Sequence, residues 1–280
     1  MNRASFSSDM APIVVTLSRL YVWALFGSVF LLGCAATPDH ATLGRDWLAI
    51  QPGVMYVRRE PVPDSVVHVV RVDLTLNRLK VSGADEKGRS LDAMVDTPST
   101  AASANASFFN RRFEPRGITV SDGVVWSPVM SQQQSPLLAC DASGHCQIQI
   151  EPPFDILPEW RNVVAGTPWL LKHGVQRTAL DDAQCKSLCA NPHPRTAVGL
   201  DESKHYLYLV TSEGRSPPVK GLSLAQLSFI MAGMGVTDAI NLDGGGSSAL
   251  FVSGKSVMKR PDDEPLQRKV SNAIHILPRK

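Results

Sequence analysis

The sequence has few aromatic residues and almost no net charge. Only 6% of its 280 residues are Phe, Trp or Tyr, and the formal net charge is +2. Proteins bind single-stranded nucleic acids by aromatic stacking and nucleic-acid backbones by strongly basic surfaces, so we expect no nucleic-acid partner. A hydrophobic content of 44% is enough for a folded core and excludes a disordered tail protein.

The N-terminal part lacks an apolar run long enough to cross a membrane as a helix. Its apolar run, residues 20–32, is too short for a bilayer span. The run ends in Leu31-Leu32-Gly33-Cys34, which resembles the signal of bacterial lipoproteins, where the cysteine becomes lipidated after cleavage. We therefore expect a signal peptide at residues 1–33 and lipidation of Cys34. The alternative is a plain signal peptide with a chance cysteine.

The residues after Cys34 bear on the destination of the protein. Ala35 and Ala36 follow, without the aspartate that marks retention in the inner membrane. We expect a protein of the cell envelope, attached through its lipid to the outer membrane and facing the periplasm or the exterior.

The other four cysteines form two closely spaced pairs, Cys140 with Cys146 and Cys185 with Cys189. Because an exported protein meets an oxidising compartment, both pairs are candidates for disulfides. Four cysteines allow three connectivities, of which we favour the local one. A zinc site made from the same thiols is the alternative, and neither spacing is the Cys-x-x-Cys typical of such sites.

The order of segments predicts a single α+β domain with a mixed, largely antiparallel sheet and a few packed helices. We expect residues 34–63 to be a tether that leads into the domain and residues 64–280 to form the domain itself. The strand-rich run at 66–76 has residues 79–81 as its expected hairpin partner. Turn-forming residues predict further hairpins at 118–126, 137–150 and 196–211.

Two helices are predicted among these strands. One follows Ser90, and the other follows Ser223, where Ser223-Leu224-Ala225-Gln226 has the form of a capping box. Apolar residues recur at helical spacing after Ser223, so we expect that helix to pack into the core and to stop at Gly235.

The most informative segment is Asn241-Leu242-Asp243-Gly244-Gly245-Gly246-Ser247-Ser248. Three glycines at the end of a buried strand leave unhindered main-chain N–H groups, and such a nest favours anions, phosphate included. Asp243 stands at the mouth of this predicted nest. The alternative is a flexible turn whose aspartate bonds its own backbone.

Five motifs together resemble the phosphodiester glycosidase family. They occur in the family's order over residues 66–277 and comprise the glycine segment and Asn105-Ala-Ser-Phe-Phe-Asn110, Arg195-Thr-Ala-Val-Gly199, Glu213-Gly214-Arg215 and Arg268-Lys-Val-Ser-Asn272. The chain departs from the family pattern at Ala106 and Ser107, where glycines are usual, at Glu213, where aspartate is usual, and at Arg215, where glutamine can occur.

The resemblance implies a hydrolase that cleaves the bond between a sugar and the phosphate of a glycosyl phosphodiester. Asp243 or Glu213 would then activate water or stabilise the developing sugar cation. Arg195 would grip the phosphate through two nitrogens. No metal or other cofactor is implied.

The remaining candidate residues would bind the substrate. The glycine amides and two hydroxyls would complete the phosphate cradle, three asparagines would bond sugar hydroxyls or hold the carboxylates, and two further arginines would add positive charge or lie as solvated surface charges. These groups are Gly244, Gly245, Gly246, Ser247, Ser248, Asn105, Asn110, Asn241, Arg215 and Arg268.

Three functions are compatible with this sequence. The first is hydrolysis of a glycosyl phosphodiester in a glycan or a sugar phosphodiester. The second is a non-catalytic glycan-binding module in polysaccharide export or assembly, and the third is a metal-assisted phosphodiesterase that leaves the sugar phosphorylated. The sequence leaves open the sugar, its anomer, the aglycone and the oligomeric state.

Overall fold

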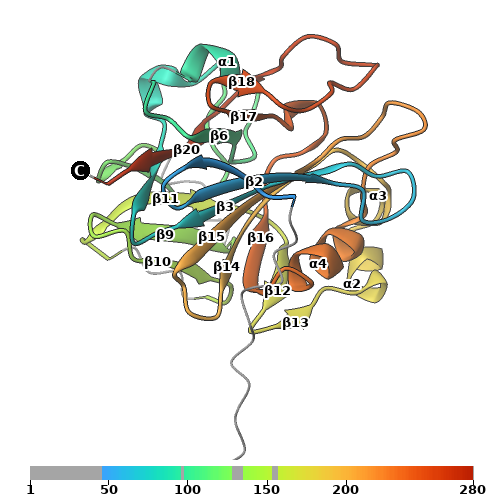
Figure 1. The fold of residues 1–280 in the computed structure, drawn as a ribbon, viewed down its shortest axis with the longest axis horizontal. Coiled ribbons are helices and arrows are strands. Elements are labelled where there is room, and N and C mark those ends of the chain that lie inside the picture. The colour runs from blue at the N-terminus through green and yellow to red at the C-terminus, as the bar shows by residue number, and fades with distance from the viewer. Residues whose placement is uncertain (1–45, 96–97, 128–134, 153–156, 280) are drawn as a thin grey trace, which may run out of the picture. The chain divides into compact units, whose positions relative to one another are not determined.

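The fold consists of β-sheets and a few short helices (Figure 1). The computed structural model describes residues 46–279, except 96–97, 128–134 and 153–156. The expected signal peptide and Cys34 lie outside the described residues. The expected largely antiparallel pairing and few helices are confirmed. Every strand pair in the described part of the chain is antiparallel, so the expected mixture with parallel strands is wrong there, and strands outweigh helices more than an α+β label implies.

The largest sheet has eight strands in the spatial order β1-β2-β3-β15-β14-β16-β12-β13. The strands are β1 (Leu48–Gln51), β2 (Val54–Arg59), β3 (Val67–Asp73), β15 (Tyr206–Ser212), β14 (Arg195–Asp201), β16 (Val236–Asn241), β12 (Trp169–Lys172) and β13 (Val175–Gln176). β1 and β2 come from the segment expected to be a tether. Because β2 pairs with β3 along its whole length, residues 48–59 belong to the sheet.

Two five-stranded sheets and a strand pair complete the framework. One sheet has the order β10 (Cys146–Gln149), β9 (Leu137–Asp141), β11 (Trp160–Ala165), β7 (Thr119–Ser121) and β8 (Val124–Val125). The other has the order β18 (Lys255–Ser256), β17 (Leu250–Val252), β6 (Ala102–Asn105), β20 (Ala273–Pro278) and β4 (Asn77–Val81). The pair is β19 (Lys269–Val270) with β5 (Arg89–Ser90).

Both faces of the large sheet are buried, which explains the nearly continuous apolar run of β3. Val70 and Val72 belong to a core that the large sheet shares with the two smaller sheets. Val67 and Val69 point to the opposite face, into a second core that includes residues of the longest helix. Successive strand residues alternate between the faces, so a strand covered on both sides needs apolar side chains throughout.

The longest helix, α4 (Leu224–Ala232), begins where its capping box predicts. The Ser223 hydroxyl accepts the Gln226 main-chain N–H, and the Gln226 side chain accepts the N–H of Ser223. Leu227 and Met231 are buried against the large sheet, as the helical spacing predicts. The helix after Ser90 is also confirmed, as the single turn α1 (Leu91–Met94).

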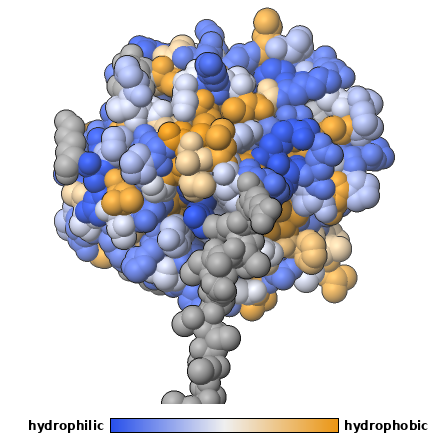
Figure 2. Space-filling model, in the orientation of Figure 1, coloured by the Kyte–Doolittle hydropathy of each residue, from blue (hydrophilic) through white to orange (hydrophobic). Residues whose placement is uncertain are grey.

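The other helices are short. They are α2 (Ala179–Gln184), α3 (Ser187–Ala190) and the 3-10 turns η2 (Ala84–Glu86) and η4 (Gly245–Ser247). Within the ranges that the structure describes, no helix has the length and apolar character needed to cross a membrane. Figure 2 shows hydrophobic side chains at the lower right, where Figure 1 places α2 and α4, and Leu180 and Phe229 of these helices are exposed.

Three of the four expected hairpins are confirmed as β7–β8, β9–β10 and β14–β15. The fourth is wrong, since β3 and β4 lie in different sheets. Both edges of β3 are occupied, by β2 and β15, so β4 has no free edge to pair with and instead joins β20. The turn after Asp73 therefore carries the chain from one sheet to another.

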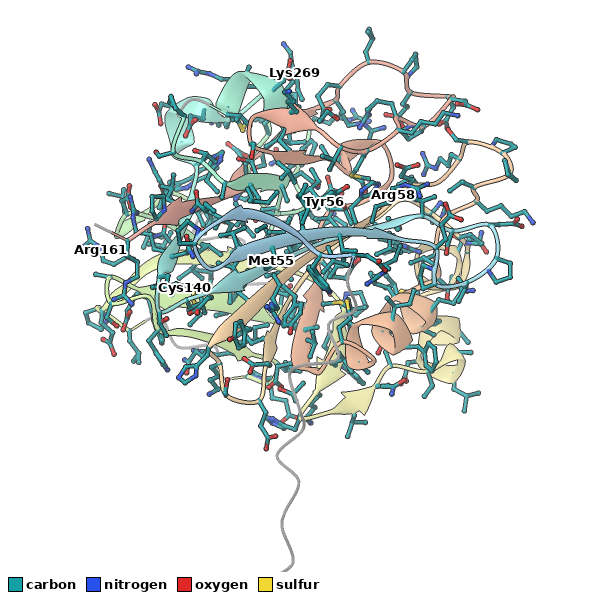
Figure 3. The ribbon with its side chains drawn as sticks, viewed as in Figure 1. Met55, Tyr56, Arg58, Cys140, Arg161 and Lys269 are labelled. Atoms are coloured by element: carbon teal, nitrogen blue, oxygen red, sulfur yellow. A yellow bond between two sulfur atoms is a disulfide. The ribbon has the colours of Figure 1, made fainter. Side chains whose placement is uncertain are left out.

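The structure contains both local disulfides, Cys140–Cys146 and Cys185–Cys189. Cys140 and Cys146 are direct partners across the β9–β10 hairpin, and Cys140 lies on the left in Figure 3. The second bridge joins the end of α2 to α3.

Candidate active site

The candidate site residues converge at one end of the large sheet. β14 begins with Arg195, whereas its neighbours β15 and β16 run antiparallel and end just before Glu213 and Asp243. Antiparallel pairing therefore gathers these three residues at the same edge, although they are far apart in the sequence. The loops of this edge lie on the right of Figure 1.

Asp243 is the carboxylate most deeply placed in the glycine loop. Its main-chain N–H donates to Ala106 O at 2.8 Å, and its Oδ1 accepts the Gly244 N–H at 3.0 Å. Burial raises the pKa of Asp243 to about 6, although the Ser247 side chain, the Gly244 N–H and the positive charges of Arg268 and Arg116 act in the opposite direction. A carboxylate with a pKa in this range exchanges protons readily near neutral pH.

Asn105 holds the Asp243 loop in place from the adjacent sheet. Its side-chain amide donates to Asp243 O at 2.7 Å, while its Oδ1 accepts the Thr196 hydroxyl at 2.7 Å and the Ala249 N–H at 3.1 Å. The side chain is fully buried. Asn105 thus connects β6, β14 and both ends of the glycine loop, which makes it a positioning residue.

The expected amide nest is largely used within the loop itself. The Gly245 N–H donates to Pro194 O at 2.8 Å, and the N–H groups of Ser247 and Ser248 donate to Gly244 O and Gly245 O. The glycines are required because the loop packs tightly, since a Cβ at Gly244 would lie 2.9 Å from Pro194 O and Gly245 has φ +60°. The loop therefore offers fewer free amides to an anion than the sequence predicts.

One serine hydroxyl and an amide oxygen in this loop region have no partner among the described residues. Ser248 Oγ and Asn241 Oδ1 are buried and form no hydrogen bond with any described residue, whereas the Ser247 side chain bonds to Asp243. Asn241 uses only its amide nitrogen, which donates to Thr167 O at 2.8 Å. Unpaired buried polar atoms are costly in a native protein, so these atoms are available to hydrogen-bond a bound group.

Arg195 is a buried cation without an acidic partner. Its Nε donates to Leu222 O and its Nη2 to Asn191 O, both at 2.9 Å, and it forms no ion pair within 4.0 Å among the described residues. Burial lowers its pKa to about 10, with Asp182 opposing this shift and Arg215 adding to it. The two carbonyls occupy nitrogens that the sequence assigned to phosphate, so Arg195 has fewer free donors than predicted.

Glu213 is engaged by a chain of hydrogen bonds. Its Oε1 lies 2.8 Å from His68 Nε2 and accepts the Lys259 N–H at 2.9 Å, and the Tyr56 hydroxyl lies 2.8 Å from His68 Nδ1. Burial acts to raise the pKa of Glu213. The hydrogen bonds from His68 and Lys259 and the charge of Arg58 outweigh this effect, so the pKa of Glu213 is lowered. Figure 3 shows Tyr56 and Arg58 on β2.

The two carboxylates therefore have opposite electrostatic environments. The pKa of Asp243 is raised by burial, whereas the pKa of Glu213 is lowered by its hydrogen-bond donors, which favour the ionised form. Carboxyl groups with divergent pKa values are typical of acid–base pairs in active sites.

Asn110 is turned toward its own loop. Its amide donates to Glu114 Oε2 at 2.7 Å, and its Oδ1 accepts the N–H groups of Arg112 and Glu114. These bonds close the turn that contains Phe113, which has φ +60°. Asn110 thus stabilises this turn in the structure.

Asn272, at the end of the motif Arg268–Asn272, holds Ala106 and Ser107 in place. The Ser107 N–H donates to Asn272 Oδ1 at 2.8 Å, and the Ala106 N–H donates to Asn272 O at 3.2 Å. Ala106 and Ser107 are buried, so side chains at these positions are accommodated without opening the loop.

Arg215 and Arg268 meet at one carboxylate. Arg215 Nη1 lies 3.4 Å from Glu264 Oε1, and Arg268 Nη2 contacts Glu264 Oε2. Arg260 binds the glycine loop directly, with Nη1 donating to Ser248 O at 2.9 Å and Nη2 to Gly246 O at 2.7 Å. Both arginines of the sequence prediction thus lie next to the glycine loop.

Sequence reasoning missed His68, Arg260 and Glu264. His68 stands between valines in the run Val66-Val67-His68-Val69-Val70, and a lone polar residue in a strand buried on both faces is a signal that was available. Arg260 and Glu264 lie in an irregular segment, where no local sequence pattern indicates which way their side chains point.

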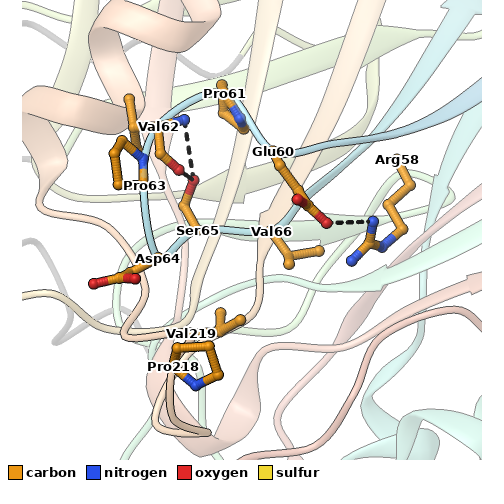
Figure 4. Close-up of a pocket in the computed structure, with 10 residues that line it drawn as sticks. All are labelled: Arg58, Glu60, Pro61, Val62, Pro63, Asp64, Ser65, Val66, Pro218 and Val219. Carbon is orange, nitrogen blue, oxygen red and sulfur yellow. Dashed lines mark hydrogen bonds and ion pairs between the residues drawn. The ribbon is translucent and has the colours of Figure 1, made fainter.

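A cavity of about 500 Å³ opens at the loop between β2 and β3 (Figure 4). It is formed by the β2–β3 loop and the segment after Arg215, and Val66, which lines it, accepts the Glu213 N–H at 2.9 Å. Its lining combines Pro61, Pro63 and Pro218 with the charged side chains of residues 58, 60 and 64. In the described ranges, no group of three or more His, Cys, Asp or Glu residues is arranged to hold a metal ion.

Comparisons with known proteins agree with this architecture. The family model described as phosphodiester glycosidase matches residues 99–277. Human N-acetylglucosamine-1-phosphodiester alpha-N-acetylglucosaminidase is 26% identical over 249 residues, which cover 81% of this chain and 47% of that protein. An uncharacterized SPbeta prophage-derived protein of Bacillus subtilis is 28% identical over 194 residues, which cover 66% of this chain and 29% of that protein. The chain thus spans less than half the length of either relative.

Solved structures share the fold. The catalytic domain of zebrafish N-acetylglucosamine-1-phosphodiester alpha-N-acetylglucosaminidase, auto-inhibited by its pro-peptide, matches with a TM-score of 0.67 at 19% identity and covers 83% of this chain and 86% of that chain. A putative exported protein of Burkholderia pseudomallei matches with a TM-score of 0.60 at 17% identity, covering 80% of this chain and 74% of that chain.

Proposed function

This chain belongs to the phosphodiester glycosidase family, and we propose that it hydrolyses the bond between a sugar and the phosphate of a glycosyl phosphodiester. The observation that carries the proposal is the partly buried Asp243, held in the glycine loop by Asn105 and Gly244, with a pKa raised to about 6 and the charges of Arg268 and Arg116 acting on it. A glycan-binding module that only holds the phosphate has no need of a carboxylate beside it that exchanges protons near neutrality.

Asp243 is the group that we assign to the chemical step. Cleavage of the glycosidic bond passes through a sugar cation, and a carboxylate stabilises that cation or activates the attacking water. The phosphate that leaves is a weak base, so the demand for a general acid is smaller than in ordinary glycoside hydrolysis. Asn105 and Gly244 fix the position of Asp243 before substrate arrives.

The arginines supply the positive charge that the leaving phosphate requires. Arg195 contributes a buried charge with no acidic partner among the described residues, and Arg215 and Arg268 lie beside the same loop. In a site of low dielectric constant such charges stabilise a developing anion strongly. The Ser248 hydroxyl, which has no partner among the described residues, provides a further donor.

The rest of the substrate has a place in the cavity at the loop between β2 and β3. The cavity combines prolines with Arg58, Glu60 and Asp64, a lining that suits an alcohol or sugar attached to the far side of the phosphate (Figure 4). Val66, which lines the cavity, accepts the Glu213 N–H, so the lining is one hydrogen bond away from Glu213, whose side chain is held by His68 and the Lys259 N–H.

A panel of sugar 1-phosphodiesters, with identification of both products, tests this proposal. Free sugar together with a phosphomonoester supports the glycosidase. Sugar phosphate together with a free alcohol contradicts it and supports a metal-assisted phosphodiesterase. Binding of the panel without turnover contradicts it and supports a glycan-binding module.

The location of the protein is part of the same proposal. We propose that the protein acts in the cell envelope, anchored by lipid at Cys34, which lies outside the described residues. The two disulfides are compatible with an oxidising compartment.

A further inference from the structure

A carboxylate of the chain itself lies on the glycine loop. A Cβ atom added at Gly246 would overlap the side-chain carboxylate of Glu264, so this carboxylate is packed directly against the Gly246 backbone. Gly246 belongs to the three glycines that the family resemblance assigns to phosphate. An anion is therefore already present where the proposed function requires one.

The same carboxylate binds the two arginines expected to bind phosphate. Glu264 Oε1 lies 3.4 Å from Arg215 Nη1, and Glu264 Oε2 contacts Arg268 Nη2. A phosphate group presents oxygens to arginine in the same way as a carboxylate does. Glu264 thus satisfies the charges that a substrate phosphate would satisfy.

The backbone of the Glu264 segment is fastened independently of the Glu264 side chain. Arg260 donates to Gly246 O and Ser248 O, and the Asp262 N–H donates to Arg215 O at 3.1 Å. The Glu264 carboxylate can therefore leave by rotation of its side chain while the segment stays in place.

One donor of the glycine loop has no partner among the described residues while Glu264 is in place. The Ser248 hydroxyl, two positions after Gly246, is buried and forms no hydrogen bond with the described part of the chain. A carboxylate fixed to a side chain reaches the two arginines but leaves this donor unused. A phosphate has more oxygens and more freedom of position, and so can use donors that the carboxylate leaves.

We propose that Glu264 is an internal stand-in for the substrate phosphate, which must displace its carboxylate from Arg215, Arg268 and the glycine loop. This inference rests on the proposed function and adds a regulation of the same site. Glu264 keeps the arginines paired in the free protein and excludes weakly binding anions. An anion that also reaches the Ser248 hydroxyl replaces it.

Displacing the Glu264 carboxylate costs little free energy because its ion pairs are partly exposed to solvent. The side-chain exposures are 24% for Glu264, 33% for Arg215 and 44% for Arg268. Ion pairs in contact with solvent contribute about 1 kcal/mol or less. A phosphate with additional hydrogen bonds can therefore compete, whereas a buried ion pair would resist exchange.

The test measures binding of inorganic phosphate, by isothermal titration calorimetry, to the wild-type protein and to Glu264→Gln and Glu264→Ala. Glu264→Gln removes the charge and keeps the size of the side chain. Glu264→Ala removes both the charge and the group that packs against Gly246. We expect phosphate to bind about five- to tenfold more tightly to both variants, because its competitor is gone. The matched control is Asp263→Asn, which removes the same charge from a more exposed carboxylate 3.6 Å from Arg215 Nη1. Its affinity should change less than about twofold.

Each outcome decides the inference separately from the proposed function. Unchanged phosphate affinity in both Glu264 variants overturns it, as does an equal gain in Asp263→Asn, which would indicate a general charge effect. Absence of phosphate binding in all four proteins overturns it as well. Tighter binding in the Glu264 variants alone supports it, even if no sugar phosphodiester is hydrolysed. Hydrolysis by a protein whose Glu264 variants bind phosphate like the wild type leaves the function standing and this inference refuted.

Discussion

The side-chain amide of Asn105 donates a 2.7 Å hydrogen bond to the main-chain carbonyl of Asp243. The two residues are 138 positions apart in the sequence: Asn105 ends β6 of one sheet, and Asp243 lies in the loop that follows β16 of another. The bond fixes the point at which β16 turns into the glycine loop, and with it the direction of the Asp243 side chain.

Asn105→Ala should destabilise the protein and reduce turnover together. The change leaves three buried partners unpaired, namely Asp243 O, the Thr196 hydroxyl and the Ala249 N–H, and we expect a loss of about 2–4 kcal/mol in the free energy of unfolding. Denaturant unfolding and steady-state kinetics on a sugar phosphodiester measure the two effects. Asn191→Ala is the control, since Asn191 is exposed and binds Arg195 only through its main chain. A variant with wild-type stability would show that the three hydrogen bonds of the Asn105 side chain are dispensable.

Asp243→Asn should lower turnover by about a hundredfold or more while the fold survives. The amide keeps the size and the oxygen that accepts the Gly244 N–H, but it removes the charge needed for the chemical step. The measurement is kcat on a sugar phosphodiester, and Asp122→Asn, in the β7–β8 turn, is the control. Wild-type turnover in folded Asp243→Asn would move the catalytic role to Glu213.

The pH dependence should report the raised pKa of Asp243, which is about 6. If the ionised carboxylate acts, kcat/KM should fall about tenfold per pH unit below pH 6, and this limb should be absent from the residual activity of Asp243→Asn. The effect on stability has the opposite sign. A carboxyl whose pKa is raised from 3.8 to about 6 stabilises the folded protein fully below pH 4, and this contribution is lost as the pH rises through 6.

Asp243→Asn should consequently be more stable than the wild type at pH 7.5, by about 1–3 kcal/mol, and the difference should vanish near pH 3.5. Thermal unfolding at the two pH values checks this. A variant less stable than the wild type at pH 7.5 would contradict the prediction that the ionised Asp243 carboxylate destabilises the folded protein.

Reduction of the two disulfides should lower the melting temperature without abolishing folding. Both bridges close very short loops, so each contributes about 2 kcal/mol at most, which corresponds to about 4–8 °C. Calorimetry with and without reductant measures the shift, and the variant with serines at 140 and 146 separates the two bridges. Four reactive thiols in the denatured, unreduced protein would refute the assignment.

Cys34→Ser should release the protein from the membrane fraction, because the proposed lipid is its anchor and residues 20–32 are too short to span a bilayer. Fractionation of cells that express the full chain checks this, with Cys189→Ser as a cysteine control. Retention of mature Cys34→Ser in the membrane pellet would argue against lipid anchoring.

Local features of this protein follow from the sequence alone. The β9–β10 hairpin and its disulfide depend on residues within one turn of each other, and the start of α4 depends on Ser223 and Gln226, three positions apart. Short-range hydrogen bonds and turn conformations involve neighbours in the chain, so their energies can be estimated without the fold. The importance of Asp243 was visible for the same reason, because its glycines follow it directly.

Long-range features were decided by the tertiary structure. β3 and β4 were expected to pair because they are adjacent in the chain, but β2 and β15 occupy both edges of β3. The glycine amides were expected to bind phosphate, but Pro194 O accepts the Gly245 N–H and Asp243 Oδ1 accepts the Gly244 N–H. The raised pKa of Asp243 and the contact of Glu264 with Gly246 arise from packing between distant segments. Desolvation depends on what surrounds a group in three dimensions, and a one-dimensional pattern does not contain that information.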